Sequence, residues 1–304
     1  MMILDNSNKR TLLLDSAMGS ALIAAGALPP GEGSESANLN FPNVVEGIHR
    51  ENIRAGCDII TANTFGAHIG ASLRKDADPA AAEKGLRAGV RIARKAADAE
   101  PTAYGTGSGA AKDGRVYVAL DIGPIGDIIG LTSSLTHDDA REVFAHMAAA
   151  GADEGADLVL IETMSDVDEA VDAILAAKAE TSLPVFCSMT FNANGKTFMG
   201  VSTEKFVRAA AEAGADAVGC NCSLGPAEMM PIAKALIGAA VDIPVIAQPN
   251  AGQPQATGEG VYYDMKPEEF SGGMYAMITE GVRIAGGCCG TTPEMIALLR
   301  ERIG

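Results

Sequence analysis

The chain has 304 residues, a formal net charge of −16 and six cysteines. Its length excludes a small fold that needs disulfide staples, and its charge argues against nucleic acid or an anionic membrane as a partner. No run approaches 18 uninterrupted apolar residues and residues 1–10 lack the apolar core of a signal peptide, so we expect a cytoplasmic protein with reduced thiols.

Short apolar runs recur along the chain and predict buried strands. Four of them belong to a recurring phrase that begins at residues 55, 154, 213 and 280, in which the apolar run follows a glycine by three positions. This is expected where a helix closes on glycine before a strand. The runs are apolar on both faces, which is typical of parallel strands covered by helices. In chain order the predicted strands lie within 11–15, 55–65, 116–121, 154–164, 183–191, 213–223, 243–250 and 280–290.

The segments between these runs have helical periodicity, most clearly at 78–98 and 202–214. Eight strand and helix pairs predict an α/β fold, a (β/α)8 barrel forming a single domain over 1–304, and the alternative is a doubly wound open sheet. The glycine-rich segment 104–115 is interpreted as a loop. Its G-x-G spacing follows a helix and not a strand, which argues against a dinucleotide site.

Polar and thiol side chains stand at the carboxyl ends of the predicted strands, where barrel enzymes carry their chemistry. In chain order they are Asp15, Asn63, Thr64, Asp121, Glu162, Asn192, Cys222, Gln248, Asn250, Cys288 and Cys289.

Three thiols on one rim suggest a metal site. A catalytic zinc takes three protein ligands and keeps a fourth position open, and Cys222, Cys288 and Cys289 would supply three thiolates. Adjacent cysteines point to opposite faces of a regular strand, so both can reach one metal only in a tight turn. The glycines within 286–290 allow such a turn, and packing alone is the alternative reading of the pair.

The other three cysteines are predicted to pack in the core. These are Cys57, Cys187 and Cys220. Cys220 lies two residues before Cys222, so we expect both on the same face of the strand, with Cys220 deeper in the barrel.

The carboxylates Asp15 and Glu162 would suit a substrate with an amino group. The alternatives are that Asp15 caps the segment after it and that Glu162 is a solvated rim charge. Asn63 and Thr64 are either site residues or turn and cap residues.

The four histidines offer little to a site. His49, His137 and His146 fall in helical segments and are predicted to lie on the surface, whereas His68 could reach the barrel mouth.

Six blocks together resemble the homocysteine S-methyltransferase family along nearly the whole chain. They are LLLDSAMGS, IITANTFGA, IETMSD, GCNCSLGP, QPNAGQP and GGCCGTTPE. The resemblance implies a zinc-dependent barrel that methylates homocysteine, bound as a zinc thiolate, to methionine. It implies one zinc on Cys222, Cys288 and Cys289, and an amino acid held by Asp15 and Glu162. Two departures are Ser16, where the family usually has glycine, and Cys220 in the variable position of G-x-N-C.

The methyl donor is a separate question. The last blocks are most similar to the homocysteine module of cobalamin-dependent methionine synthases, but only fifteen residues follow Cys289, so no folate or cobalamin module is expected. We therefore expect a methylated corrinoid protein as donor in trans. The alternatives are S-methylmethionine, betaine, and a non-catalytic subunit that binds zinc and a thiol amino acid. Betaine is disfavoured because the chain has no Trp, and because Thr163 stands where that branch tends to carry Tyr.

Overall fold

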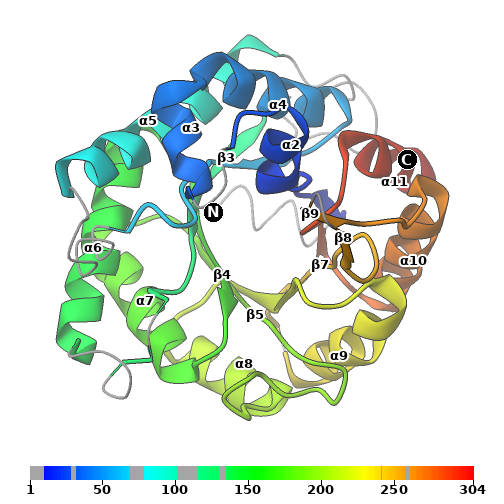
Figure 1. The fold of residues 1–304 in the computed structure, drawn as a ribbon. Helices are drawn as coiled ribbons and strands as arrows, with labels where there is room; N and C mark the ends of the chain where they lie inside the picture. Colours follow the sequence, from blue (N-terminus) through cyan, green and yellow to red (C-terminus); the bar gives the residue numbers. More distant parts are fainter. Residues whose placement is uncertain are drawn as a thin grey trace.

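The computed structural model describes residues 10–28, 32–68, 79–100, 115–126, 128–129, 135–240, 242–257 and 260–304. Eight parallel strands form one sheet that curls into a barrel inside a ring of helices (Figure 1). The order around the sheet is β1 (Leu12–Leu13), β10 (Ile284–Ala285), β7 (Val245–Gln248), β6 (Ala217–Asn221), β5 (Val185–Met189), β4 (Leu158–Met164), β3 (Tyr117–Ile122) and β2 (Ile59–Thr61). The predicted (β/α)8 barrel is confirmed, and each of these strands coincides with one of the predicted runs.

Helices follow the strands in the expected alternation. They are α2 (Met18–Ala24), α3 (Ala37–Asn40), α4 (Pro42–Arg54), α5 (Pro79–Ala99), α6 (His137–Asp153), α7 (Val167–Glu180), α8 (Thr203–Glu212), α9 (Pro226–Ala239), α10 (Pro267–Glu280) and α11 (Pro293–Ile303), with a 3-10 turn η1 (Ser34–Ser36). Within the described residues, no helix has the length and apolarity to cross a membrane. The predicted loop 104–115 lies outside the described residues except for Arg115.

A small antiparallel hairpin after β7 was not predicted from the sequence. It pairs β8 (Gln255–Thr257) with β9 (Gly260–Tyr262). Each strand has three residues, too few to show the alternation of apolar and polar residues by which a strand is recognised.

The recurring glycine phrase is the joint between a helix and the next strand. Its glycine has a positive φ in all four copies, between 95° and 125°, a conformation that side chains disfavour. In three copies, the aspartate two residues later accepts a hydrogen bond of 2.8–2.9 Å from a backbone N–H of the preceding strand. The pairs are Asp58 with Leu13, Asp157 with Val118, and Asp216 with Val185. These joints fix the strands at their amino ends.

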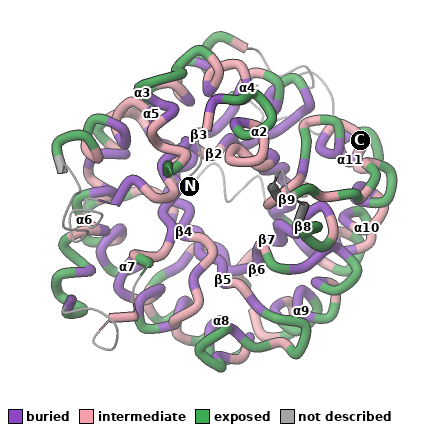
Figure 2. The backbone as a smooth tube through the Cα atoms, in the orientation of Figure 1, coloured by how far each residue is buried: buried purple, intermediate pink, exposed green. Residues whose placement is uncertain are grey.

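The barrel interior is filled by apolar side chains that alternate along all eight strands. They are Leu12, Leu14, Ile59, Tyr117, Ala119, Leu158, Leu160, Phe186, Ala217, Ile246 and Ile284. Figure 2 shows the strands as a buried centre and the helices with exposed outer faces. Because side chains alternate, the next interior position after this layer on β2, β3, β4 and β7 is polar, with Thr61, Asp121, Glu162 and Gln248. This polar layer lies at the carboxyl end of the barrel.

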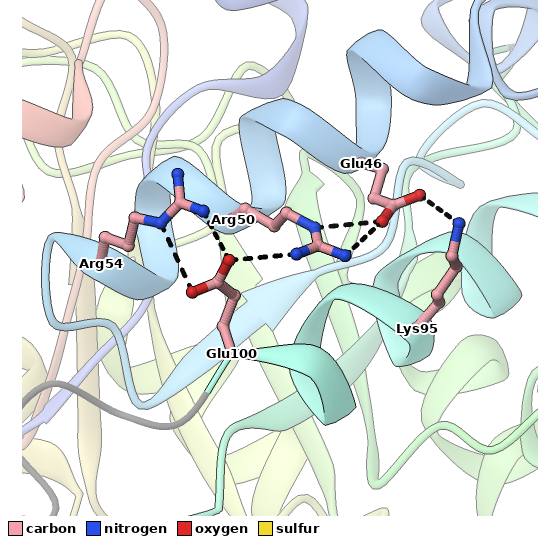
Figure 3. Close-up of polar contacts among 5 residues, drawn as sticks. All are labelled: Glu46, Arg50, Arg54, Lys95 and Glu100. Carbon is pink, nitrogen blue, oxygen red and sulfur yellow. Dashed lines mark hydrogen bonds and ion pairs between the residues drawn. The ribbon is translucent and has the colours of Figure 1, made fainter.

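Five charged residues join α4 to the end of α5 on the outer surface (Figure 3). Arg50 lies between two carboxylates, 2.7 Å from Glu46 and 3.1 Å from Glu100. Lys95 pairs with Glu46 at 2.6 Å, and Arg54 with Glu100 at 2.5 Å. The neighbouring Lys95 and Arg50 lower the pKa of Glu46, and Arg54 and Arg50 lower that of Glu100. Ion pairs on a protein surface stabilise a fold only weakly.

The surface prediction for His49 is wrong. His49 is fully buried, because it shares the inward stripe of α4 with Val45, Ile48 and Asn52. Burial lowers the pKa of its imidazole to about 4, which keeps the ring neutral near pH 7. The surface predictions for the other two helical histidines are confirmed, since the side chains of His137 and His146 are about half exposed.

Candidate metal centre and substrate cavity

A cavity of about 330 Å³ opens at the carboxyl end of the barrel. Its wall includes the thiols of Cys222, Cys288 and Cys289. It also includes three carboxylates from three different strand ends, Asp15, Asp121 and Glu162. The cavity is large enough for a small amino acid and brings soft and anionic groups together in one wall.

The three thiols form a compact cluster. All three Sγ atoms lie within 4.8 Å of one another, with Cys289 at 3.9 Å from Cys222 and 4.0 Å from Cys288. Zinc–sulfur bonds of about 2.3 Å in tetrahedral geometry place two sulfur ligands about 3.8 Å apart. The donor set therefore fits zinc in number, softness and spacing. Hydrogen bonds from Cys222 and Cys288 lower the pKa of the Cys289 thiol, so the cluster favours a thiolate.

The backbone turns directly after β6 and after β10, and these two turns orient the three thiols. Cys222 and Ser223 follow β6 with φ values of 60° and 65°, which are uncommon for residues other than glycine and cost roughly 1–3 kcal/mol each. After β10 the chain turns at residues 288–291, where the N–H of Thr291 donates to the carbonyl of Cys288. Gly290 has φ 77°, and a Cβ there would lie 2.2 Å from the ring of Tyr263. A tight turn at the cysteine pair was expected and is observed.

The remaining cysteines lie outside the cluster. Cys57, Cys187 and Cys220 are buried among apolar side chains between the sheet and the helices. Burial in the core is confirmed for all three, but Cys220 was expected inside the barrel, and that part of the prediction is wrong. The expected common face of Cys220 and Cys222 is wrong. Cys220 points outward from β6, and the positive φ of Cys222 ends the strand alternation before that residue.

Asp15 joins β1 to β2 through its side chain. Its carboxylate accepts hydrogen bonds from the N–H and the hydroxyl of Thr61, both at 2.8 Å. It does not cap α2, whose N-cap is Ala17 without a side-chain cap bond, so the capping alternative is wrong. Burial raises the pKa of Asp15 to about 7, although the bonds from Thr61 oppose that rise.

Glu162 faces the cavity from the end of β4. Gln248 donates to its carboxylate at 3.2 Å, and burial raises its pKa to about 7, helped by the negative charge of Asp15. This is not the environment of a solvated rim charge. The next residue, Thr163, has φ 64° and is held by Asn221, which accepts its N–H at 2.9 Å and donates to its hydroxyl at 2.7 Å.

Of the other predicted residues, one lines the cavity wall, and the others are buried and bond to the backbone. Asn63 lines the cavity, and its amide donates to the Ser34 carbonyl at 2.7 Å. Thr64 is fully buried, and its hydroxyl binds the backbone of Asp121. His68 is also buried, and its Nε2 lies 2.7 Å from the Gly123 carbonyl. Substrate binding by Asn63 and Thr64 stays a prediction, which the position of Asn63 favours more than that of Thr64.

The comparisons with known proteins agree with this geometry. The family model described as homocysteine S-methyltransferase matches residues 12–303. The chain belongs to this family. It is similar to the methionine synthases of Mycobacterium leprae, with 33% identity, and Mycobacterium tuberculosis, with 34% identity, over 97% of this chain. The chain spans about a quarter of the length of these two relatives.

Solved structures support the fold of this homocysteine S-methyltransferase family member. The metallated form of the homocysteine methyltransferase MmuM from Escherichia coli matches with a TM-score of 0.80 and 23% identity. The match covers 99% of this chain and 98% of MmuM. The two proteins thus share the barrel fold over nearly their whole length.

Sequence reasoning gave no role to three residues of the site. Asn221 is fully buried and fixes the ends of β4 and β6 relative to one another. Asp121 and Gln248 line the cavity, and Oδ1 of Asp121 and Oε1 of Gln248 have no hydrogen-bond partner within the described part of the chain. The signal for the last two was their place in the alternation, one interior position beyond the apolar layer.

The departure at Ser16 has a structural consequence. Its N–H and its hydroxyl both donate to Oδ1 of Asn52 on α4, at 2.9 and 2.8 Å. The serine therefore anchors the turn after β1 to a helix, and the turn still places Asp15 in the cavity wall.

Proposed function

We propose that this chain transfers a methyl group to homocysteine and forms methionine, using one zinc ion per chain. The observation that carries the proposal is the pairing, within one cavity of amino-acid size, of a three-thiol cluster with buried carboxylates. Cys222, Cys288 and Cys289 would hold the metal and leave one position for the substrate. When bound, zinc would keep the substrate thiol ionised and nucleophilic.

The carboxylates orient the amino acid. Asp15 and Glu162 would accept hydrogen bonds from the substrate ammonium, and their burial makes each charge-assisted bond stronger than it would be in water. Asn221 holds the backbone at Thr163, next to Glu162, and also bonds to Ser188. These bonds fix the position of the Glu162 backbone relative to the neighbouring strands. Orientation of this kind lowers the entropy cost of the methyl transfer.

For the donor we propose a methylated corrinoid protein acting in trans. The curated relatives at 33% and 34% identity are methionine synthases. Betaine is disfavoured, because a quaternary ammonium is commonly held by several aromatic faces, and Phe65 is the sole aromatic side chain among the described residues of the cavity wall.

The test combines metal analysis with turnover. The purified chain should contain one zinc and should convert homocysteine to methionine with a methylated corrinoid protein, in parallel with S-methylmethionine and betaine assays. Turnover with any donor excludes the non-catalytic binding subunit. Binding of zinc and homocysteine without turnover favours that subunit instead. Absence of both zinc and homocysteine binding contradicts the proposal.

A further inference from the structure

Asp121 is a buried carboxylate at the cavity that no contact in the fold explains. It ends the interior row of β3, two positions after Ala119, and only 8% of its surface is exposed. Its Oδ1 has no hydrogen-bond partner among the residues that the structure describes, although the residue lines the cavity. A buried acceptor without a partner destabilises the fold. The position of this acceptor at a cavity points to a hydrogen-bond donor on a bound ligand.

The fold positions Asp121 through its backbone and leaves the carboxylate free for another task. The hydroxyl of Thr64 donates to the Asp121 carbonyl at 2.8 Å and lies 3.1 Å from its N–H. Both bonds would survive loss of the side-chain charge. The carboxylate is therefore dispensable for this joint between the ends of β2 and β3.

The electrostatic surroundings call for a cation. Burial raises the pKa of Asp121 well above its ordinary value, and the negative charges of Glu162 and Asp15 raise it further. None of these three carboxylates forms an ion pair within the described residues. Asp15 and Glu162 could accept two hydrogen bonds from an ammonium. An ammonium has three N–H donors, so a third carboxyl group in the same cavity can accept the remaining bond.

We propose that Asp121 binds the substrate ammonium as the third carboxylate of the cavity and restricts the site to thiols that carry an amino group. The inference rests on the proposed function and deepens it. A thiol without the ammonium would leave Oδ1 of Asp121 without a hydrogen bond and all three carboxyl groups without a cation. Sites built to hydrogen-bond a group strongly reject analogues that lack it. The free Oε1 of Gln248 lies in the same wall and adds a fourth acceptor.

The test compares two thiols on zinc-loaded protein by calorimetry. The probes are homocysteine and 4-mercaptobutanoate, which is homocysteine without its amino group. Wild type should prefer homocysteine by at least about a hundredfold. Asp121→Asn keeps the size of the side chain and should weaken homocysteine about tenfold to a hundredfold without weakening 4-mercaptobutanoate, so that the preference narrows. Asp121→Ala serves as a second variant with the same expectation.

The matched control is Asp157→Asn, at the opposite end of the barrel, where the carboxylate bonds to Val118 and Arg94. It should lower thermal stability and leave the preference unchanged. An unaltered homocysteine affinity in Asp121→Asn, or an equal loss for both thiols, overturns the inference while the proposed function stands. If wild type with zinc binds neither thiol, the proposed function fails and the inference fails with it.

Discussion

The two ends of the barrel use buried carboxylates for different purposes. At the amino end, Asp58, Asp157 and Asp216 each accept a backbone N–H and each pair with a lysine or arginine. At the carboxyl end, Asp15, Asp121 and Glu162 face a cavity, and no ion pair of the described residues includes them. The carboxylates at the amino end combine a strand contact with an ion pair. Those at the carboxyl end have no ion pair, although Asp15 also joins β1 to β2, and this state favours an incoming cation.

The carboxylates at the two ends differ in whether a cation compensates for the burial of their charge. Burial raises the pKa of Asp15 and Glu162 to about 7, and no ion pair among the described residues compensates for their desolvation. An unpaired buried carboxylate destabilises the fold, and the barrel tolerates several of them at one end only. In barrel enzymes the carboxyl end carries the chemistry and the amino end carries stability, and the carboxylates of this chain follow that division.

The largest expected effect is at the thiol cluster. Cys289→Ala removes the central sulfur, which lies within 4.0 Å of both other thiols. Zinc content should fall nearly to zero and methyl transfer with it, because two thiolates hold zinc far more weakly than three. The variant should stay folded, since a core of this size does not depend on one metal. Metal analysis and circular dichroism measure both.

Cys220→Ala is the control for that prediction. Its thiol packs between the sheet and the helices, so the variant should keep full zinc. Loss of zinc in Cys220→Ala, or full zinc in Cys289→Ala, would contradict the ligand assignment.

At the amino end, Asp58→Asn should reduce stability without touching the site. Asp58 accepts the N–H of Leu13 and pairs at 2.6 Å with Arg300, which is 3% exposed. The substitution breaks this buried ion pair, which costs about 3–5 kcal/mol of the free energy of unfolding. Urea denaturation measures the loss. A weaker affinity for homocysteine in the folded variant would contradict the assignment of Asp58 to stability alone.

The stability of the zinc-free protein should fall as the pH rises from 4 to 7. The folded pKa of Asp15 is about 7 against 3.8 for the free side chain, so in this window the folded state binds more protons than the unfolded state. The free energy of unfolding therefore decreases with pH, by on the order of 4 kcal/mol at most from this residue. Asp15→Asn should flatten the decrease measured by urea denaturation at several pH values. An unchanged slope would show that Asp15 does not titrate in this range.

The smallest effect belongs to the outer surface. Glu100→Gln removes the partner of Arg50 and Arg54 at the seam between α4 and α5 (Figure 3). Exposed pairs contribute little and are screened by salt, so the thermal midpoint should barely move, and zinc content should stay the same. A large drop in thermal midpoint would mean that this network stabilises the barrel as strongly as the buried joints.

The sequence predicted most of the fold because its signals are local. A glycine at a helix end followed by an apolar run marks four of the joints, and the apolar runs mark the strands. The short hairpin of β8 and β9 gave no such signal. His49 was misplaced because a polar residue on the apolar stripe of a helix contradicts the pattern from which the buried face is recognised.

The site was only partly predictable, since its geometry depends on backbone turns. The thiol cluster could be inferred from the strand ends, but the positive φ of Cys222 turns that residue away from the face of Cys220. Likewise, the two hydrogen bonds by which Asn221 holds Thr163 join residues 58 positions apart. Such contacts leave no trace in a local pattern.

The most direct test of the account is the affinity of zinc-loaded Glu162→Gln for homocysteine. Glutamine keeps the size of the side chain and removes the charge that would meet the ammonium. Calorimetry in two buffers of different ionisation enthalpy should show binding about tenfold to a hundredfold weaker than in wild type, with zinc retained and a proton released as the thiol binds. Unchanged affinity together with no proton release at pH 7 would contradict it, because neither the carboxylate nor the metal would then meet the substrate.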